Sequence, residues 1–137
     1  MDIAYRVRAD ALIKAIAEVL KENKEIKMPE NYDLLKTGHG KLHSPSDLDW
    51  MYTRMAAIAR QIMCKGTVSL IGLTFRYSNR KNMGVRPSRC ARGSKFVNMY
   101  CVKTLEQIGW VDYANKGDIL TARGKEVLGE IVDKLME

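Results

Sequence analysis

Apolar side chains recur every three or four residues in four parts of this sequence, two of them before residue 66. Residues 11–23 have this pattern directly after Asp10, whose side chain can cap a helix. Residues 48–65 have it again, and Gly66 follows as a typical C-terminal stop. We therefore predict two amphipathic helices. Their expected buried faces are Leu12, Ile16, Val19 and Leu20, and Met51, Met55, Ile58 and Ile62.

The other two helical patterns lie in the last third of the chain. Ser94 is suited to cap a helix over residues 95–108, and Gly109 stands at its end. Thr121 is suited to cap a last helix that runs to about Met136. The expected buried faces are Val97, Cys101, Leu105 and Ile108, and Leu128, Ile131, Val132 and Leu135.

Two regions lack this helical periodicity: the segment before the second helix and the segment between the second and third helices. Residues 28–49 are rich in turn-forming residues, which predicts an irregular segment with a short helix around Tyr32–Lys36. Residues 67–76 suit a short strand or an extended segment. Residues 77–93 are too basic to be core, so we expect a loop there.

A β-hairpin is predicted over residues 110–120, which alternate in polarity on both sides of Asn115-Lys116-Gly117. The order of helix, helix, short strand, helix, hairpin and helix is typical of one DNA- and RNA-binding architecture. The expected fold is therefore mainly α: a winged helix-turn-helix with additional helices and one β-hairpin as its wing.

Length and composition favour one compact domain, because 137 residues that are 46% hydrophobic can fill a single core. We expect a winged-helix core at about 48–137, with the helix at about 10–23 packed on it. No apolar run approaches the roughly 20 residues that span a bilayer, and the N-terminus has no secretory signal pattern. We expect a location in the cytosol or nucleus and no membrane partner.

Cysteine and histidine do not indicate a metal site. Cys64, Cys90 and Cys101 are odd in number and form no CxxC pair, which favours free thiols in a reducing compartment. His39 and His43 have no cysteine close by, and their spacing matches no zinc pattern. We expect no metal and no cofactor.

Charge is distributed very unevenly along the chain. Residues 1–49 carry eight basic and nine acidic side chains, and residues 106–137 carry four and seven. Residues 50–105 carry eleven basic side chains and no Asp or Glu. Eleven like charges in one small domain repel each other unless a polyanion neutralises them, so nucleic acid is the favoured partner. The alternative is that these cations only decorate a solvated surface.

The most informative basic segment is residues 86–95, where Arg86, Arg89, Arg92 and Lys95 are three apart. Pro87 disfavours helix at Arg86, so we expect an extended, polyproline-like chain. Such a chain has about three residues per turn, which would place the four charges along one edge. The segment leads into a helix N-terminus, and free N–H groups there bind phosphate.

Further cations belong to the same expected RNA-binding surface. Arg54 and Arg60 leave the second helix away from its apolar face, and we expect both to be exposed. Aromatic side chains near the surface could stack on bases, although core packing is their commoner role. The complete set of expected RNA-binding residues is Trp50, Arg54, Arg60, Arg76, Arg80, Lys81, Arg86, Arg89, Arg92, Ser94 and Lys95.

Three stretches resemble one family, the eukaryotic and archaeal small-subunit ribosomal protein S-nineteen-e. Residues 49–60, DWMYTRMAAIAR, are similar to its helix motif D/N-W-[FY]-Y-x-R-x-A-x-x-A-R. Residues 84–95, GVRPSRCARGSK, are similar to its loop motif G-V-x-P-S-H-x-x-R-G-S-K. Residues 120–124, LTARG, match the weaker L-T-x-x-G motif. The resemblance extends from the Asp10 helix to the end of the chain.

The resemblance implies a non-enzymatic protein of the small-subunit head that binds the 3′ domain of small-subunit rRNA and supports maturation of its precursor. The partners would be that rRNA and neighbouring head proteins. The location would be the cytoplasmic ribosome, with assembly in the nucleus and nucleolus of a eukaryote. Relatives usually have Gly-Gly where Ser78-Asn79 stand and Arg-Arg where Met99-Tyr100 stand. We therefore expect less RNA contact from the helix that carries Met99-Tyr100.

Two other functions are consistent with parts of the sequence. A winged-helix DNA-binding transcription regulator would read bases from the helix at 95–108, but its outer residues offer few base-reading side chains. An enzyme would need a carboxylate or histidine in its site, and residues 50–105 contain neither. That segment also has no phosphate-binding glycine motif, so no small-molecule substrate is expected.

Overall fold

The four helices expected from the apolar periodicity are present in the computed structural model, which describes residues 2–114 and 117–137. They are α1 (Ala9–Glu22), α2 (Trp50–Lys65), α4 (Lys95–Gln107) and α5 (Ala122–Met136). The Ser94 and Thr121 hydroxyls cap α4 and α5 by accepting from backbone N–H groups three residues ahead. Gly66 follows α2 with a φ of +84°, and Gly109 follows the last turn of α4 with a φ of +82°. Both are in the left-handed conformation in which glycine commonly ends a helix. The mainly α class is confirmed.

The expected start of α1 is wrong by two residues. The helix begins at Ala9, and Arg8 occupies the cap position without a side-chain hydrogen bond. Asp10 lies in the first turn, where its carboxylate pairs with Arg8 at 3.0 Å. The acidic side chain therefore acts on the positive helix end as a first-turn charge, not as a cap.

The N-terminal half also contains two short 3₁₀ helices, η1 (Asp2–Arg6) and η2 (Tyr32–Leu34). The second lies in the irregular segment where a short helix was expected, and it is shorter than the expected span. Tyr32 packs its ring against Trp50 at the start of α2, with centroids 5.5 Å apart and planes 7° apart. This stacked pair fixes the irregular segment to the helix.

The strand expected over residues 67–76 is wrong, because most of that segment is the helix α3 (Leu70–Arg76). Ser69 caps it, accepting from the Gly72 N–H at 3.1 Å. Leu73 and Thr74 are its buried residues, and α3 packs against α4. Only Val68 pairs as a strand would, in an isolated bridge with Asp118. The cap at Ser69 and the burial of one side of α3 favour the helix more than the β-branched residues of this segment favour a strand.

The C-terminal hairpin is confirmed as β3 (Val111–Ala114) paired antiparallel with β4 (Gly117–Leu120). Its expected turn residues Asn115 and Lys116 lie outside the described residues.

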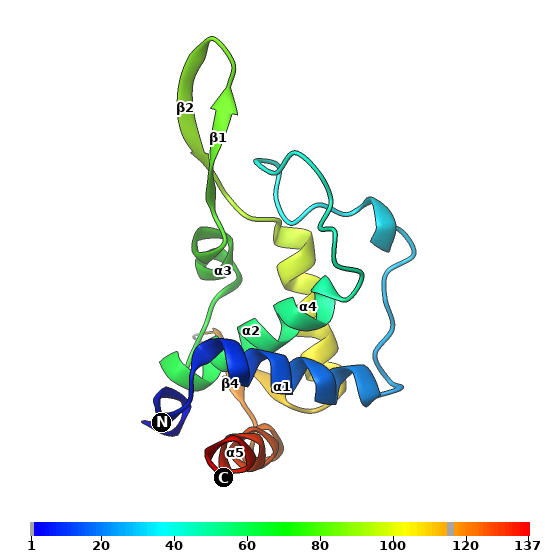
Figure 1. Cartoon of the computed structure of the whole chain (residues 1–137), viewed down its shortest axis with the longest axis vertical. Helices are drawn as coiled ribbons and strands as arrows, with labels where there is room; N and C mark the ends of the chain where they lie inside the picture. The colour runs from blue at the N-terminus through cyan, green and yellow to red at the C-terminus, as the bar shows by residue number, and fades with distance from the viewer. Residues whose placement is uncertain (1, 115–116) are drawn as a thin grey trace.

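The loop expected over residues 77–93 is wrong, and so is the expectation of a single hairpin. β1 (Asn79–Met83) and β2 (Arg86–Ala91) form a second antiparallel hairpin, connected by Gly84 and Val85. Gly84 has φ of +75°, a conformation that favours glycine at the first position of a two-residue connection. In Figure 1 this hairpin extends away from the helices as a separate projection.

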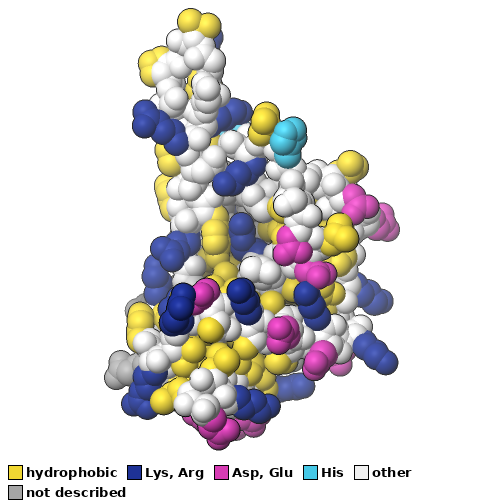
Figure 2. Space-filling view, in the orientation of Figure 1, with side chains coloured by type: hydrophobic (Ala, Val, Ile, Leu, Met, Phe, Trp, Pro, Cys, Tyr) yellow, Lys and Arg dark blue, Asp and Glu magenta, His cyan; other side chains and the backbone are white. Residues whose placement is uncertain are grey.

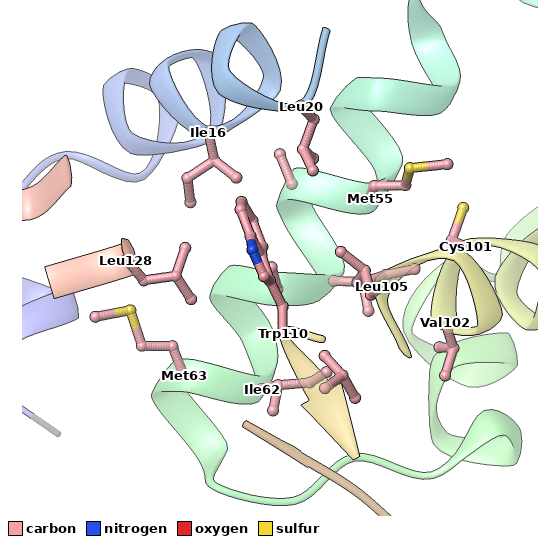
Figure 3. Packing of buried hydrophobic residues seen from close by; sticks show 14 of the residues in the cluster. Ile16, Leu20, Met55, Ile62, Met63, Cys101, Val102, Leu105, Trp110 and Leu128 are labelled. Carbon is pink, nitrogen blue, oxygen red and sulfur yellow. The ribbon is translucent and has the colours of Figure 1, made fainter. Parts of the chain in front are cut away.

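One hydrophobic core joins α1, α2, α4, α5 and the β3–β4 hairpin. Figure 3 shows the Trp110 side chain among Ile16 and Leu20 of α1, Ile62 of α2 and Leu128 of α5. Trp110 is 5% exposed, and it immediately precedes β3. Burying so large a ring contributes substantially to the hydrophobic stabilisation of the fold. No described residue of the β1–β2 hairpin belongs to this core, in keeping with the projection of the hairpin away from the helices in Figure 1.

Candidate nucleic-acid interface

Three cations meet in a cleft that is formed by η1, α1, α2 and the end of α3. Arg60, Lys65 and Arg76 line this cleft, whose volume is about 400 Å³, and none of its described lining residues is acidic. Arg60 is only partly exposed, and its Nε atom is buried without a hydrogen-bond partner among the described residues. Because three cations and no described acidic side chain line it, this cleft is suited to an anionic group such as phosphate.

Arg54 lies one to two turns earlier on α2 and is held by protein groups, which corrects the expectation that it is exposed. Its guanidinium carbon lies 3.8 Å from the centroid of the Tyr77 ring, and Nη1 donates to Oδ1 of Asn98 at 3.3 Å. Asn98 is 0% exposed. Burial lowers the pKa of the Arg54 guanidinium and raises the pKa of the Tyr77 phenol. Arg54 is therefore a structural tether between α2 and α4, with one edge reaching the surface.

That edge opens into a second cleft of about 330 Å³, which Trp50 and Arg54 line together with Asp47. Trp50 is half-buried and stacks on Tyr32, so its ring anchors the start of α2. This cleft shares Ala57 and Tyr77 with the cleft at Arg60. The two clefts are thus neighbours along one side of α2.

The β1–β2 hairpin sorts its cations onto two faces. Lys81 lies opposite Arg89, and Met83 lies opposite Arg86. Opposite residues share a face of a hairpin, as do residues two apart on a strand. Lys81, Arg86 and Arg89 therefore share one face, and Arg80 lies on the other.

The shared face of Arg86 and Arg89 depends on a β-bulge. A regular strand places residues three apart on opposite faces. Here the pairing register shifts between Lys81 and Met83, because β2 has one residue more than β1 across this stretch. The extra residue restores the alternation, so both arginines point to the same side.

Arg92, Ser94 and Lys95 follow the hairpin and form a third group. The Arg92 guanidinium lies 4.3 Å from the centroid of the Phe75 ring, which orients it by a cation–π contact. Ser94 is the cap of α4, and Lys95 is the exposed first residue of that helix. Positive charge next to a helix N-terminus is a suitable setting for phosphate.

The expected single row of four charges is wrong, because β2 ends at Ala91 and a helix begins at Lys95. The expected residues form separate groups on α2–α3, on the hairpin and at the start of α4. Sequence reasoning missed Lys65, which the acid-free charge pattern could have indicated. It also missed Lys36 and His39, which line a cleft of about 610 Å³ with Arg92 and Ser94. Those two residues lie in a segment of mixed charge, so the sequence held no signal for them.

Among the residues whose side chains the structure describes, no carboxylate forms an ion pair with a cation of residues 50–105. The ion pairs among the described residues are Arg8 with Asp10 and Lys21 with Asp49, and neither involves a cation of this segment. In Figure 2 the projecting hairpin carries dark-blue Lys and Arg side chains, whereas the magenta Asp and Glu side chains lie lower on the body. This surface therefore requires a polyanion or solvent to balance its charge.

Within residues 2–114 and 117–137, no group of three or more His, Cys, Asp or Glu side chains is arranged to hold a metal ion. No helix in this described part is both long and apolar enough to cross a membrane.

Comparisons with known proteins place the chain in one family. The family model for ribosomal protein S19e matches residues 3–137. The small ribosomal subunit protein eS19 of Encephalitozoon cuniculi is 35% identical, over 97% of this chain and 96% of the relative. The small ribosomal subunit protein eS19B of Schizosaccharomyces pombe is 36% identical, over 96% of this chain and 92% of the relative. The eS19 protein of Myxine glutinosa is 32% identical, over 95% of this chain and 90% of the relative. The motifs, the basic clefts and these full-length similarities lead to one conclusion: this chain belongs to the ribosomal protein S19e family.

Proposed function

We propose that this chain is a structural constituent of the small ribosomal subunit head, where it binds the 3′ domain of small-subunit rRNA. The observation that carries the proposal is the group of cations on residues 50–105 that no carboxylate of the described residues pairs with. Membership of a ribosomal protein family and relatives named as small-subunit proteins support it. Neighbouring head proteins would be its other partners, and no catalytic role is proposed.

Recognition would rest on phosphate position and RNA shape. The Arg60 cleft, the basic face of the hairpin and the start of α4 are separate groups, which suits a folded RNA whose backbone passes the protein at several points. Arginine predominates because its planar fork can hold two phosphate oxygens. The protein would thereby support precursor rRNA maturation and subunit assembly, in the nucleus and nucleolus of a eukaryote, and then remain in the cytoplasmic ribosome.

We also propose that residues 48–137 form a winged-helix core on which α1 packs, within a single domain. The helices α2, α3 and α4 followed by the β3–β4 hairpin have the order of that architecture. Packing of α3 against α4 and of α1 against α2 supports this arrangement. The β3–β4 hairpin would be the wing.

A DNA-binding transcription regulator is the second candidate, because winged helices commonly place one helix in the major groove. The groove along the outer side of α4 argues against it. Glu106 and Asp118 line that groove together with apolar side chains such as Val102 and Ile71, and Lys95 and Lys103 line it too. This groove is thus mixed in charge and partly apolar, whereas the cleft at Arg60 has three cations and no acidic residue among its described lining, which favours RNA binding there over this DNA-reading mode.

Sedimentation of the tagged protein in a cell lysate tests the proposal. We expect stoichiometric cosedimentation with small subunits and their precursors, which dissociation of the subunits by magnesium removal and high salt should abolish. Recovery only in free or chromatin-bound fractions would instead favour the transcription regulator.

The hairpin cations should account for part of the salt dependence of RNA binding. Each phosphate contact changes the slope of log affinity against log salt by about 0.7–0.9. The double variant Arg86→Gln/Arg89→Gln should therefore flatten the slope by about 1.4–1.8, measured by fluorescence anisotropy with a 3′-domain transcript. Lys125→Gln/Lys134→Gln on α5 is the matched control, since both lysines are exposed in the acidic C-terminal part. Equal slopes for the two variants would mean that Arg86 and Arg89 do not contact phosphate.

A further inference from the structure

The tip of the β1–β2 hairpin presents apolar side chains to solvent. Val85 is 107% exposed and Met83 is 40% exposed. Figure 2 shows yellow, hydrophobic side chains at the end of the projection. The connection is ordered by its own chemistry, because the Gly84 N–H donates to Oδ1 of Asn82 at 2.9 Å and Gly84 has positive φ. The two apolar side chains therefore lie at an ordered connection at the outer end of the hairpin.

Nothing in the described fold covers the outer part of this hairpin. Every residue from Asn82 to Cys90 is exposed, and β1–β2 is a sheet of only two strands. A two-stranded hairpin is marginally stable in water unless something packs on it. Exposed apolar groups at its tip add no stability to the free protein. These features are typical of a segment that is completed by a binding partner.

The surroundings of the tip define the chemistry of that partner. Lys81, Arg86 and Arg89 lie on one face and Arg80 on the other, and no carboxylate occurs anywhere between residues 50 and 105. A partner that contacts the tip must pass these four cations, which favours a polyanion with apolar surfaces between its charges. RNA has this combination, since unpaired bases expose flat apolar faces next to phosphates.

The geometry also limits where on RNA the tip can bind. The major groove of a regular A-form helix is deep and too narrow for side chains to reach the bases. Loops, bulges and helix ends leave base faces open, and apolar side chains are used as wedges against bases in other nucleic-acid complexes.

We propose that the β1–β2 hairpin inserts its tip into an unpaired region of the rRNA, where Met83 and Val85 pack against exposed base faces. Lys81, Arg86 and Arg89 contact the phosphates on the side of the hairpin that they share. This inference rests on the proposed function and adds a base-contacting element to it. The apolar contact releases no counterions, whereas each phosphate contact does, and this difference makes the two separable in the salt slope.

The test is the double variant Met83→Ser/Val85→Ser, titrated against the 3′-domain transcript over a salt series. We expect an affinity lower by a factor on the order of ten at every salt concentration, with the slope of wild type. The variant Met83→Leu/Val85→Ile keeps apolar side chains on the same backbone and should bind within about twofold of wild type. The control Leu34→Ser/Met136→Ser removes two exposed apolar side chains, 81% and 53% exposed, far from the hairpin in sequence and should bind like wild type.

Three outcomes would overturn the inference. One is a serine variant that binds like wild type, which would mean that the tip faces solvent or a protein. Another is equal loss in the serine and the Leu/Ile variants, which would mean that the tip acts through something other than apolar contact. The third is equal loss in the Leu34/Met136 control, which would mean that the effect is not local. Wild-type binding and the slope of the Arg86/Arg89 variant test the proposed function separately, so its failure is distinguishable from failure of the tip.

Discussion

Gly124→Ala is expected to destabilise the protein by about 3 kcal/mol, even though alanine is the better helix former. A Cβ atom at position 124 would lie 2.3 Å from the backbone oxygen of Trp110. That oxygen accepts from the Thr121 N–H at 3.0 Å, and Trp110 itself is buried, so the carbonyl cannot move aside without disturbing the core. Urea unfolding followed by circular dichroism measures the loss.

Gly129→Ala on the same helix is the matched control. A Cβ there meets nothing within 4 Å, so alanine should stabilise the protein by about 0.5–1 kcal/mol through helix propensity alone. The two substitutions are chemically identical and should change stability in opposite directions. The close approach of α5 to the Trp110 backbone would be contradicted if both stabilised it.

Arg54→Ala is expected to lower the free energy of unfolding by about 2 kcal/mol. The change removes the cation–π contact with Tyr77 and leaves Oδ1 of the fully buried Asn98 without its donor. Nδ2 of Asn98 already lacks a partner among the described residues, so this amide has no other hydrogen bond to compensate. In the wild-type protein, the stabilisation by these Arg54 contacts is partly offset by the cost of burying the guanidinium. The same burial lowers the pKa of Arg54.

Arg80→Ala provides the comparison for that measurement, because Arg80 is exposed on the hairpin and its removal should change stability by no more than about 0.5 kcal/mol. A double-mutant cycle of Arg54→Ala with Tyr77→Leu should give a coupling of about 1 kcal/mol. The tether would be contradicted if the coupling between Arg54 and Tyr77 were zero and the Arg54→Ala protein were as stable as the Arg80→Ala protein. Arg54 would then be free to contact RNA, as its position on α2 first indicated.

The helices were predictable because each one carries an apolar face that the core requires. Ile16, Met55, Leu105 and Leu128 were all expected from spacing alone, and all are fully buried. Val19 and Leu135 were expected on the same buried faces, but Val19 is only partly buried and Leu135 is exposed. Both lie at the edges of the apolar faces of their helices. Periodicity identifies the direction of a buried face better than its width.

The α3 helix and the β1–β2 hairpin were missed for different reasons. The seven residues of α3 are too few to establish a helical period, and the signal that could have found it is the capping serine at Ser69. The hairpin has no alternation of apolar and polar residues because neither of its outer faces packs on the core. Asn82 and Gly84 were its turn signals.

The candidate site was predictable in composition but not in arrangement. The absence of acids from residues 50–105 indicated cations that, in the described part of the chain, have no carboxylate in an ion pair with them. Periodicity could not tell that Arg54 would be covered, because Tyr77 and Asn98 come from α3's end and α4, 23 and 44 positions away. Contacts over such distances are set by tertiary packing and leave no trace in a local pattern.

The bulge in β2 also bears on how this hairpin should be compared among relatives. A hairpin shorter by the one extra residue would pair regularly, and the two arginines would then be two apart and still share a face. An arginine spacing of three with a bulge is thus equivalent to a spacing of two without one. A spacing of three in an unbulged relative would instead divide the charge between both faces. Alignment by strand register, with a gap allowed at the bulge, will therefore identify equivalent arginines that alignment by residue position separates.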